Sequence, residues 1–225
     1  MTLPFTRPAG GGWLALLGGG EFSFGETLDA DRAWLEKTPP GPIGFVPAAS
    51  GSVDYPRHFA TYLQQTFGRE VEALPVYRAR DARRQKHAGR VGELAGVYLG
   101  GGVTDHLLEA LAAAPLVDAL LERLRAGGVV VAIAAAGQAL GTVARSLFGG
   151  ALVPGLGWLP GGVVEPSFQP GHDRRLRQMM AFGGVSWGVG IPAGGALLLG
   201  PDGAAETVGP LFLLTDADGD LQVLE

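Results

Sequence analysis

Short apolar runs alternate with amphipathic segments over the first 150 residues of the chain. The apolar runs are bounded by glycine, proline or small residues, as buried strands of a parallel sheet are. They cover Trp13–Leu17, Ile43–Val46, Val71–Val76, Val97–Leu99 and Val129–Ile133. The segments with helical spacing are Asp29–Lys37, Tyr55–Phe67, Thr104–Ala126 with a break near Pro115, and Ala136–Phe148. This alternation predicts an α/β fold, in which a mostly parallel sheet is flanked by helices on both faces.

The last third of the chain has a different pattern. Residues 153–164 are rich in Gly and Pro, and Arg174–Phe182 has helical spacing. Short apolar runs follow at 185–189, 196–199, 207–208, 211–214 and 221–224, with turn signals at 201–203 and 218–220. This spacing predicts antiparallel C-terminal hairpins that extend the sheet. Since no internal repeat or linker divides the chain, we expect a single α/β domain over residues 1–225.

Composition excludes several classes of protein. Of the 225 residues, 47% are hydrophobic, which is enough to bury a large core, and a net charge of −5 without a run of Lys or Arg argues against nucleic-acid binding. The absence of Cys excludes disulfides, zinc–thiolate sites, iron–sulfur clusters and a Cys nucleophile. Neither Lys37 nor Lys86 follows a glycine, and Gly18–Gly20 leads into Glu21, so phosphate-loop and dinucleotide motifs are incomplete. We therefore expect neither a cofactor nor a metal.

Location is predicted from what the chain lacks. No apolar stretch reaches the ~18–20 residues that a membrane-spanning helix needs. The segment before the first strand does not show the pattern of a signal peptide. We expect a cytoplasmic protein without a membrane partner.

Glycine-rich segments follow the strands at the edge where a doubly wound sheet binds its ligands. Glycine lets the backbone approach a ligand and direct its N–H groups at it. Each segment alone is explained as an ordinary strand-to-helix turn, and Glu21 as a cap of the next turn, but together the segments predict a pocket. The candidate cleft residues are Gly19, Gly20, Glu21, Ser50, Gly101 and Gly102.

The segment Val129–Leu140 carries the clearest sign of chemistry. An apolar strand runs into a helix with only small residues at the corner, which is the geometry of a nucleophile elbow. Ala135 stands at the expected nucleophile position, followed by Ala136, and both are counted with the candidate cleft residues. Because alanine has no group that can attack a carbonyl, this elbow has no nucleophile.

Five motifs in order resemble the cyanophycinase and aspartyl dipeptidase family of serine peptidases. They read GGGE near the N-terminus, PAAS after the second strand, GGGxT before a helix, the elbow, and GLGxLPG. The resemblance covers about Trp13 to Leu214 and implies a flavodoxin-like sheet of the class I glutamine amidotransferase type. It also implies a homodimer as one arrangement of the chain.

The resemblance implies a catalytic triad that this chain lacks. The family's elbow reads roughly GxSAG, which places the nucleophilic Ser on Ala135. The family's His, which precedes a Phe, falls on Ser167, and the acid is expected between the two, where residues 123–164 contain no Asp, Glu or His. Since the three groups act as a unit, we expect no peptidase, cyanophycinase or amidase activity.

Other interpretations stay open. A hydrolase with a relocated site would use Ser167 with His172, although a surface His at a helix start explains His172 as well. Arg174, Arg175 and Arg177 lie where the family carries arginines, and they fit a carboxylate clamp or a solvated helix face. Our interpretation is a non-catalytic homologue, a pseudoenzyme, whose cleft binds a small acidic or peptide-like ligand or whose fold serves as a protein partner.

Overall fold

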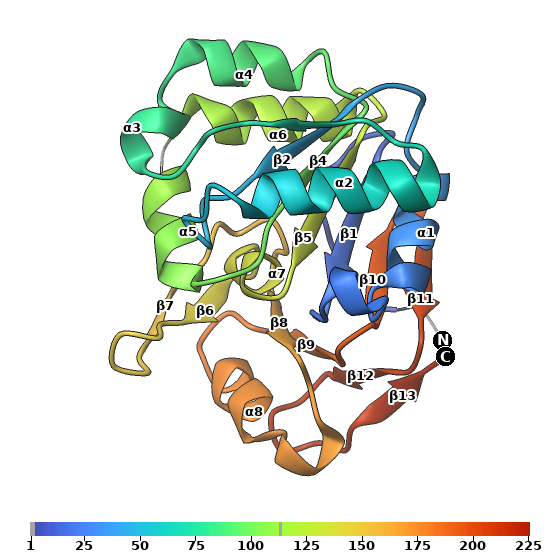
Figure 1. Ribbon diagram of the computed structural model, residues 1–225. Coiled ribbons are helices and arrows are strands. Elements are labelled where there is room, and N and C mark those ends of the chain that lie inside the picture. Colours follow the sequence, from blue (N-terminus) through green and yellow to red (C-terminus); the bar gives the residue numbers. More distant parts are fainter. Residues whose placement is uncertain (1–2, 113) are drawn as a thin grey trace.

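Five parallel strands form the centre of the protein. The computed structural model describes residues 3–112 and 114–225 (Figure 1). Its main sheet has the order β11 (Ala205–Val208), β10 (Ala196–Leu199), β1 (Trp13–Leu17), β5 (Val129–Ile133), β4 (Gly96–Leu99), β2 (Ile43–Val46) and β3 (Val71–Ala73). The strands from β1 to β3 in this order are parallel, while β10 and β11 join one edge in antiparallel orientation. The expected α/β fold with a mostly parallel sheet is confirmed.

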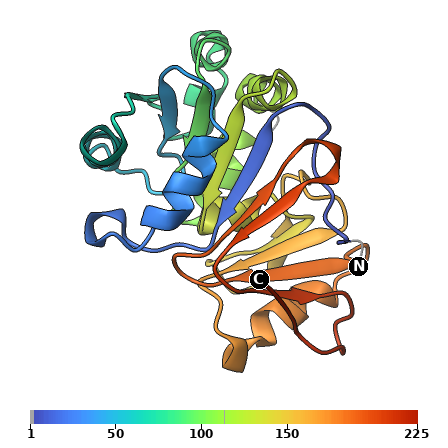
Figure 2. The ribbon, with the colours of Figure 1, turned by 90° about the vertical axis from the view of Figure 1, so that its right-hand side faces the viewer.

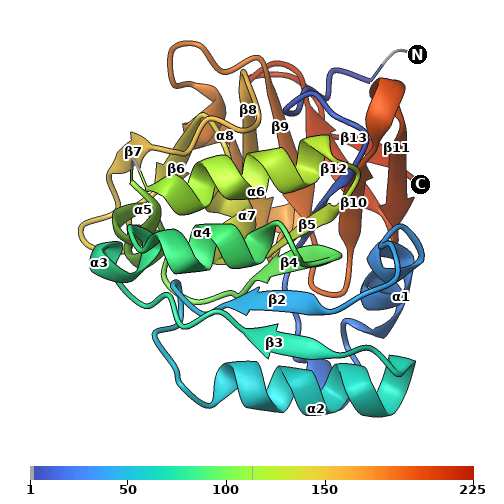
Figure 3. The same cartoon turned by 90° about the horizontal axis from the view of Figure 1, so that it is seen from above.

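Helices cover both faces of this sheet (Figure 3). One face packs against α1 (Leu28–Glu36) and α2 (Tyr55–Phe67). The other packs against α3 (Ala79–Ala82), α4 (Gln85–Val91), α5 (Thr104–Leu111) and α6 (Pro115–Arg125). The helix expected at 104–126 is broken at Pro115, as predicted, because proline is favoured in the first turn of a new helix. Residue 113, between α5 and α6, lies outside the described residues.

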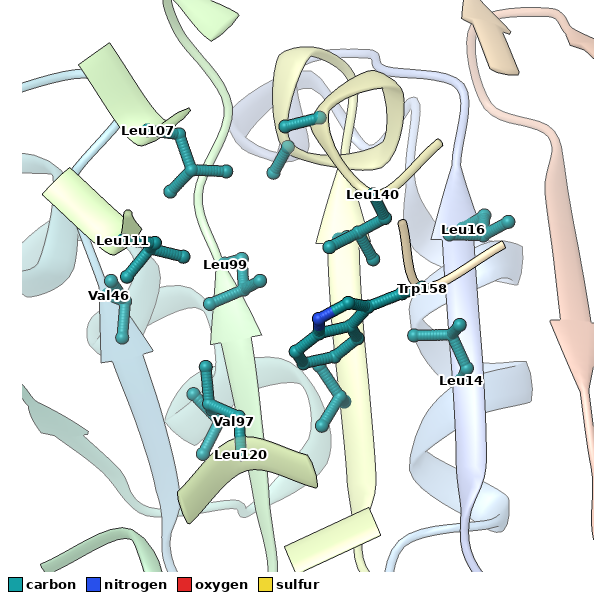
Figure 4. Close-up of a cluster of buried hydrophobic side chains, with 14 of the residues drawn as sticks. Leu14, Leu16, Val46, Val97, Leu99, Leu107, Leu111, Leu120, Leu140 and Trp158 are labelled. Atoms are coloured by element: carbon teal, nitrogen blue, oxygen red, sulfur yellow. The ribbon is translucent and has the colours of Figure 1, made fainter. Parts of the chain in front are cut away.

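Alternate residues of each central strand contribute to two hydrophobic cores. On β1, Leu14 and Leu16 belong to the core under α5 and α6, whereas Ala15 and Leu17 belong to the core under α1 and α2. Because both faces of these strands are buried, they read as continuous apolar runs in the sequence. Figure 4 shows the first core, in which Trp158 reaches from the loop before the second sheet toward the side chains of β1.

The C-terminal third forms a second sheet beside the first (Figure 2). Its order is β13 (Gln222–Leu224), β12 (Leu211–Leu214), β9 (Trp187–Ile191) and β8 (Gly162–Pro166). The expectation that hairpins extend the main sheet is therefore correct for β10 and β11 and wrong for β12 and β13. The strands β8 and β9 are parallel, and α8 (Arg174–Met180) connects them and packs Leu176 and Met179 into a third core.

The helix expected at 136–148 is much shorter than predicted. The structure has α7 (Ala135–Ala139), followed by a hairpin of β6 (Val143–Arg145) and β7 (Leu152–Pro154). The chain after α7 is drawn onto the second sheet, because the N–H of Thr142 donates to the carbonyl of Gly162 at 2.8 Å. Gly141 is closely surrounded there, since a Cβ would lie 3.1 Å from the Val143 carbonyl oxygen and 3.2 Å from that of Gly162.

Three short 3-10 turns complete the described structure: η1 (Phe22–Phe24), η2 (Pro170–His172) and η3 (Pro201–Gly203). Within residues 3–112 and 114–225, no helix is long and apolar enough to cross a lipid bilayer.

Candidate functional site

The sharp turn between β5 and α7 places its strained residue at Ala134. Ala134 has φ 51° and ψ −115°, a backbone region that non-glycine residues rarely occupy. Its N–H donates to the carbonyl of Leu17 at 2.8 Å, and its carbonyl accepts from the N–H of Gln138 at 3.1 Å. In a nucleophile elbow the strained residue is the one that presents the nucleophile. The structure therefore corrects the expected position by one residue, from Ala135 to Ala134.

Ala135 and Ala136 are the first residues of α7. Ala136 is completely buried in the core under α5 and α6, and Ala135 is 9% exposed. The prediction that Ala136 lines the cleft is wrong, because the helix turns its methyl group inward directly after the corner. The residue at the corner itself is still an alanine, so the conclusion that no nucleophile stands there is unchanged.

Two glycine turns close on the methyl group of Ala134. A Cβ built on Gly19 would lie 3.7 Å from the Cβ of Ala134, and one built on Gly101 would lie 3.6 Å from it. Gly19 also has φ 121°, which favours glycine. The structure thus brings the predicted residues Gly19 and Gly101 together with the methyl group at the elbow.

Ser167 lies beside the same glycine, Gly19, as Ala134 does. A Cβ on Gly19 would be 3.1 Å from the hydroxyl oxygen of Ser167. Ser167 follows β8 in a left-handed conformation with φ 49°, and both its N–H (2.7 Å) and its hydroxyl (3.3 Å) donate to the carbonyl of Gly18. The residue that the resemblance places at the position of the catalytic His is therefore next to the elbow, as that placement requires, and it is a hydroxyl in place of a base.

Ser167 and His172 line one hollow of about 590 Å³, together with Glu165, Arg174 and Arg175. The Nδ1 atom of His172 pairs with the amide oxygen of Gln169 at 3.1 Å, and the Ser167 hydroxyl is directed at the Gly18 carbonyl. His172 and Ser167 are therefore each hydrogen-bonded to a different group and not to one another. A base aimed at Ser167 is the central requirement of a relocated hydrolase site, and His172 does not fill it in this arrangement.

Most of the other predicted cleft residues build turns. Glu21 caps η1, because its carboxylate accepts from the N–H (3.3 Å) and the hydroxyl (3.0 Å) of Ser23. A Cβ on Gly20 would meet the Cβ of Glu26 at 3.2 Å. A Cβ on Gly102 would lie 2.4 Å from the carbonyl oxygen of Ala49, so the turn after β4 packs directly on the loop after β2.

Ser50 has a structural partner and a separate position. Its hydroxyl donates to the carbonyl of Pro47 at 3.1 Å and accepts from the N–H of Ser52 at 3.2 Å. It lines a second hollow, with Arg78 and His106, beside α3 and α5.

A buried polar network under α7 was not found from the sequence. The hydroxyl of Thr104 donates to the side-chain oxygen of Gln138 (3.3 Å), whose amide nitrogen donates to the carboxylate of Glu165 (3.3 Å). Burial raises the pKa of Glu165, and the guanidinium groups of Arg145 and Arg175, each 3.9 Å from the carboxylate, act in the opposite direction. A lone Gln in a helix of small residues and a Glu after two valines were the signals that could have revealed it.

The three arginines of α8 have different roles. Arg177 is a structural residue, since it donates to the carboxylate of Asp173 and to the carbonyls of Ala217 and Gly219, each at 2.8 Å. Arg174 and Arg175 line the hollow beside Ser167 and are exposed. Of the two interpretations of this segment, the geometry therefore supports a carboxylate clamp only for Arg174 and Arg175.

Tyr55 forms part of the wall behind the turn after β4, and the sequence did not single it out. A Cβ on Gly100 would lie 3.2 Å from the ring of Tyr55. Burial raises the pKa of Tyr55 to about 12, and a backbone hydrogen bond from Gly101 opposes this rise. The phenol therefore stays neutral at physiological pH and offers no proton acceptor for catalysis. Among the described residues, no group of three or more His, Asp or Glu side chains is arranged to hold a metal ion.

Known proteins share the sequence pattern and the fold of this chain. The family model for peptidase family S51 matches residues 14–145, which is more than half of the chain. The chain belongs to peptidase family S51. The matched region includes the elbow of this S51 member and ends before Ser167. A comparison with curated protein sequences gives no match.

Two solved structures share the fold of this S51 member. A peptidase from an acI-B1 Actinobacterium superposes with a TM-score of 0.75 at 22% identity, over 97% of this chain and 96% of that one. A protein assigned as a peptidase E from Listeria monocytogenes EGD-e has a TM-score of 0.64 at 14% identity, over 88% of this chain and 98% of that one. At these identities the likeness shows the fold alone.

Proposed function

We propose that this member of peptidase family S51 is a pseudoenzyme that binds a small acidic or peptide-like ligand without cleaving it. The observation that carries the proposal is the pair Ala134 and Ser167: a methyl group at the strained corner, and beside it a hydroxyl where the family resemblance calls for a base. Together these two side chains do not form a nucleophile–base pair. Without that pair, the rate of catalysis falls by several orders of magnitude.

The hollow beside Ser167 supports the ligand class. It presents the guanidinium groups of Arg174 and Arg175 to solvent and the carboxylate of Glu165 at its wall. Guanidinium groups bind carboxylates in a bidentate manner. A short peptide with an acidic side chain matches the two exposed positive charges of Arg174 and Arg175.

Binding without turnover is the direct test. Isothermal titration with α-aspartyl and β-aspartyl dipeptides should show saturable binding, and the same peptides should remain intact after long incubation with the protein. Arg175→Glu should weaken binding by about tenfold, because it reverses one of the charges that face the hollow. Turnover by the unmodified protein at rates of ordinary enzymes would overturn the proposal.

A gain-of-function pair tests the assignment of the corner. The double variant Ala134→Ser/Ser167→His restores the two missing groups, and we expect hydrolysis of an activated ester at least about tenfold above that of the wild type, since a positioned base contributes about 10²–10⁴-fold. The matched control is Ala135→Ser/Ser167→His, in which the new hydroxyl lies one residue beyond the corner and should give no gain. The single variant Ser167→Ala addresses the alternative: if wild-type hydrolysis is found and this variant abolishes it, the relocated site is correct.

A further inference from the structure

A second hollow, of about 690 Å³, lies beside α3 and α5. Its wall includes Ser50 and Val53 from the loop after β2, Tyr77, Arg78 and Arg80 around the start of α3, and His106 from α5. It shares no lining residue with the hollow beside Ser167. A volume of this size is in the range of sites that bind ligands.

The segment around α3 is basic in a protein that is acidic as a whole. Residues 78–86 carry five Arg and Lys side chains and one carboxylate, while the whole chain has a net charge of −5. That carboxylate, Asp81, is buried and accepts from the N–H groups of Tyr77 (3.3 Å) and Arg78 (3.2 Å). The guanidinium groups of Arg80 and Arg84 lie 3.7 and 3.6 Å from it and are more than half exposed. Glu109 of α5 is a second carboxylate in the wall of the hollow. Against Arg78, Arg80 and Arg84, the two carboxylates Asp81 and Glu109 leave one net positive charge at the hollow.

Exposed apolar side chains gather at the same place. Val53 in the wall of the hollow is 71% exposed, and Leu147 and Phe148 at the tip of the β6–β7 hairpin are 57% and 69% exposed. In Figure 1 this hairpin projects from the body of the protein below α5. The ring of Phe148 packs against that of His106, with 5.9 Å between the ring centroids. The N–H of Leu147 donates to the carboxylate of Asp105 at 2.9 Å, so the hairpin tip is fixed to α5.

The fixed position of this hairpin tip affects the free energy of binding a partner. Exposed apolar residues that lie close together mark binding surfaces more often than scattered ones do. A surface whose side chains are already ordered loses less conformational entropy when a partner binds. The contacts of Asp105 and His106 supply that order here, because Asp105 fixes the backbone of Leu147 and His106 packs against the ring of Phe148.

We propose that this surface, formed by Val53, Arg78, Arg80, His106, Leu147 and Phe148 and called here the Arg78–Phe148 surface, binds an acidic peptide segment that carries aromatic or aliphatic residues. The arginines would pair with the carboxylates of the segment, and Val53, Leu147 and Phe148 would cover its apolar side chains. Because the surface runs from the hollow out to the tip of a hairpin, an extended segment fits it better than a small molecule does. The proposal is independent of ligand binding beside Ser167.

Fluorescence anisotropy with a defined probe tests this proposal on the full chain. The probe is a fluorescein-labelled peptide in which Asp and Glu alternate with Phe and Leu, and the comparison peptide has Lys in place of every acid. The wild type should bind the acidic probe and not the Lys peptide. Arg78→Glu/Arg80→Glu and, separately, Phe148→Ser should each weaken binding by about tenfold, through lost charge pairing and lost apolar contact. Arg32→Glu on α1, which is exposed and lies in a surface ion pair, is the matched control and should bind like the wild type.

Three outcomes would overturn the proposal. The first is an acidic probe that fails to bind the wild type. The second is an affinity that falls with Arg174→Glu and not with Arg78→Glu/Arg80→Glu, since the probe would then occupy the hollow beside Ser167. The third is a single-stranded DNA probe that binds as tightly as the peptide and is insensitive to Phe148→Ser, which would make the surface a general polyanion site. Circular dichroism of each variant verifies that the fold is retained.

Discussion

Ala134 holds a backbone conformation that costs a non-glycine residue about 1–3 kcal/mol, although its methyl group can do no chemistry. The conformation is set by the neighbours, through the hydrogen bonds from its N–H to Leu17 and from the N–H of Gln138 to its carbonyl. The main sheet and α7 therefore keep the corner in shape without help from the side chain.

Replacing Ala134 by glycine should stabilise the protein. The variant Ala134→Gly relieves the left-handed strain, and after the larger entropy of glycine in the unfolded chain is subtracted, we expect a gain of about 1 kcal/mol in the free energy of unfolding. Urea denaturation measures this gain as a higher midpoint. Ala136→Gly in the buried first turn of α7 is the control and should lower the midpoint. A lower midpoint for Ala134→Gly would show that the corner is not strained.

Glu165 is expected to make stability depend on pH. Its pKa is raised by burial, so the folded state holds this proton more tightly than the unfolded state does. Stability from this group is therefore present below the unfolded pKa and is lost as the pH rises through the folded pKa. The melting temperature of Glu165→Gln relative to the wild type should rise between pH 4 and pH 8. A constant difference over that range would contradict the role of burial.

The sequence predicted that the corner lacks a nucleophile but not which residue forms it. Residues 134–136 are all alanine, so the alignment can move by one position without any change in residue type. Only the dihedral angles separate Ala134 from Ala135. The local sequence does not mark Glu165 for a related reason, because its neighbours in β8 are apolar and its partners Gln138 and Arg145 come from distant segments of the chain.

At the scale of elements, the site edge depends on the packing of one turn against another. Gly102, after β4, has φ 146°, and the next N–H, that of Val103, donates to the carbonyl of Ala49 at 2.9 Å. A side chain at Gly102 would collide with that same carbonyl, at 2.4 Å. The loops after β2 and β4 can therefore pack this closely only because residue 102 has no Cβ.

Gly102→Ala is expected to destabilise the protein strongly. The collision involves rigid backbone, so we expect a loss of about 2–4 kcal/mol in the free energy of unfolding, measured by urea denaturation. The matched control is Gly51→Ala, which also has a positive φ, 64°, but has no atom within 4 Å of its added Cβ. It should lose only about 1 kcal/mol. Equal losses in the two variants would show that conformation, and not collision, decides the cost.

The sequence predicted well those elements whose buried faces show up as a local repeat of apolar residues. The central strands and α2 follow from local periodicity, because both faces of each strand and one face of the helix are buried. The helix expected at 136–148 failed because the bond between Thr142 and Gly162 captures the chain after α7. Residues far apart in sequence determine that bond, so local propensity could not reveal it.

At the scale of the whole molecule, the segment before β1 ties the two sheets together. The ring of Phe5 packs edge-on against Trp187 of β9 at 5.2 Å, and the hydroxyl of Thr6 donates to the carbonyl of Pro160 at 2.6 Å. The guanidinium of Arg7 donates to the carbonyl of Gly200, after β10, at 2.7 Å, and to two carbonyls of its own segment. The segment thus bridges from the second sheet to the antiparallel edge of the first.

Arg7→Ala should weaken this connection. Three hydrogen bonds from a charged donor are lost, part of which water replaces, so we expect a loss of about 2 kcal/mol in the free energy of unfolding. Chemical denaturation followed by Trp fluorescence measures it, because Trp187 lies under Phe5. Arg57→Ala, which removes an exposed ion pair with Asp54 on α2, is the control and should change stability by less than about 1 kcal/mol. A similar loss in both variants would argue against a bridging role for Arg7.

The carbonyls of Leu17, the last residue of β1, and of Gly18 after it hold Ala134 and Ser167 in place. Leu17 accepts from the N–H of Ala134, and Gly18 accepts from the N–H of Ser167. Although Ser167 is exposed, this bond holds its amide, and we expect the amide proton to be released when the second sheet separates from β1. In deuterated water this amide should therefore exchange at the slow rate of the core amides of β1, which would make a surface residue a reporter on the opening of the whole molecule.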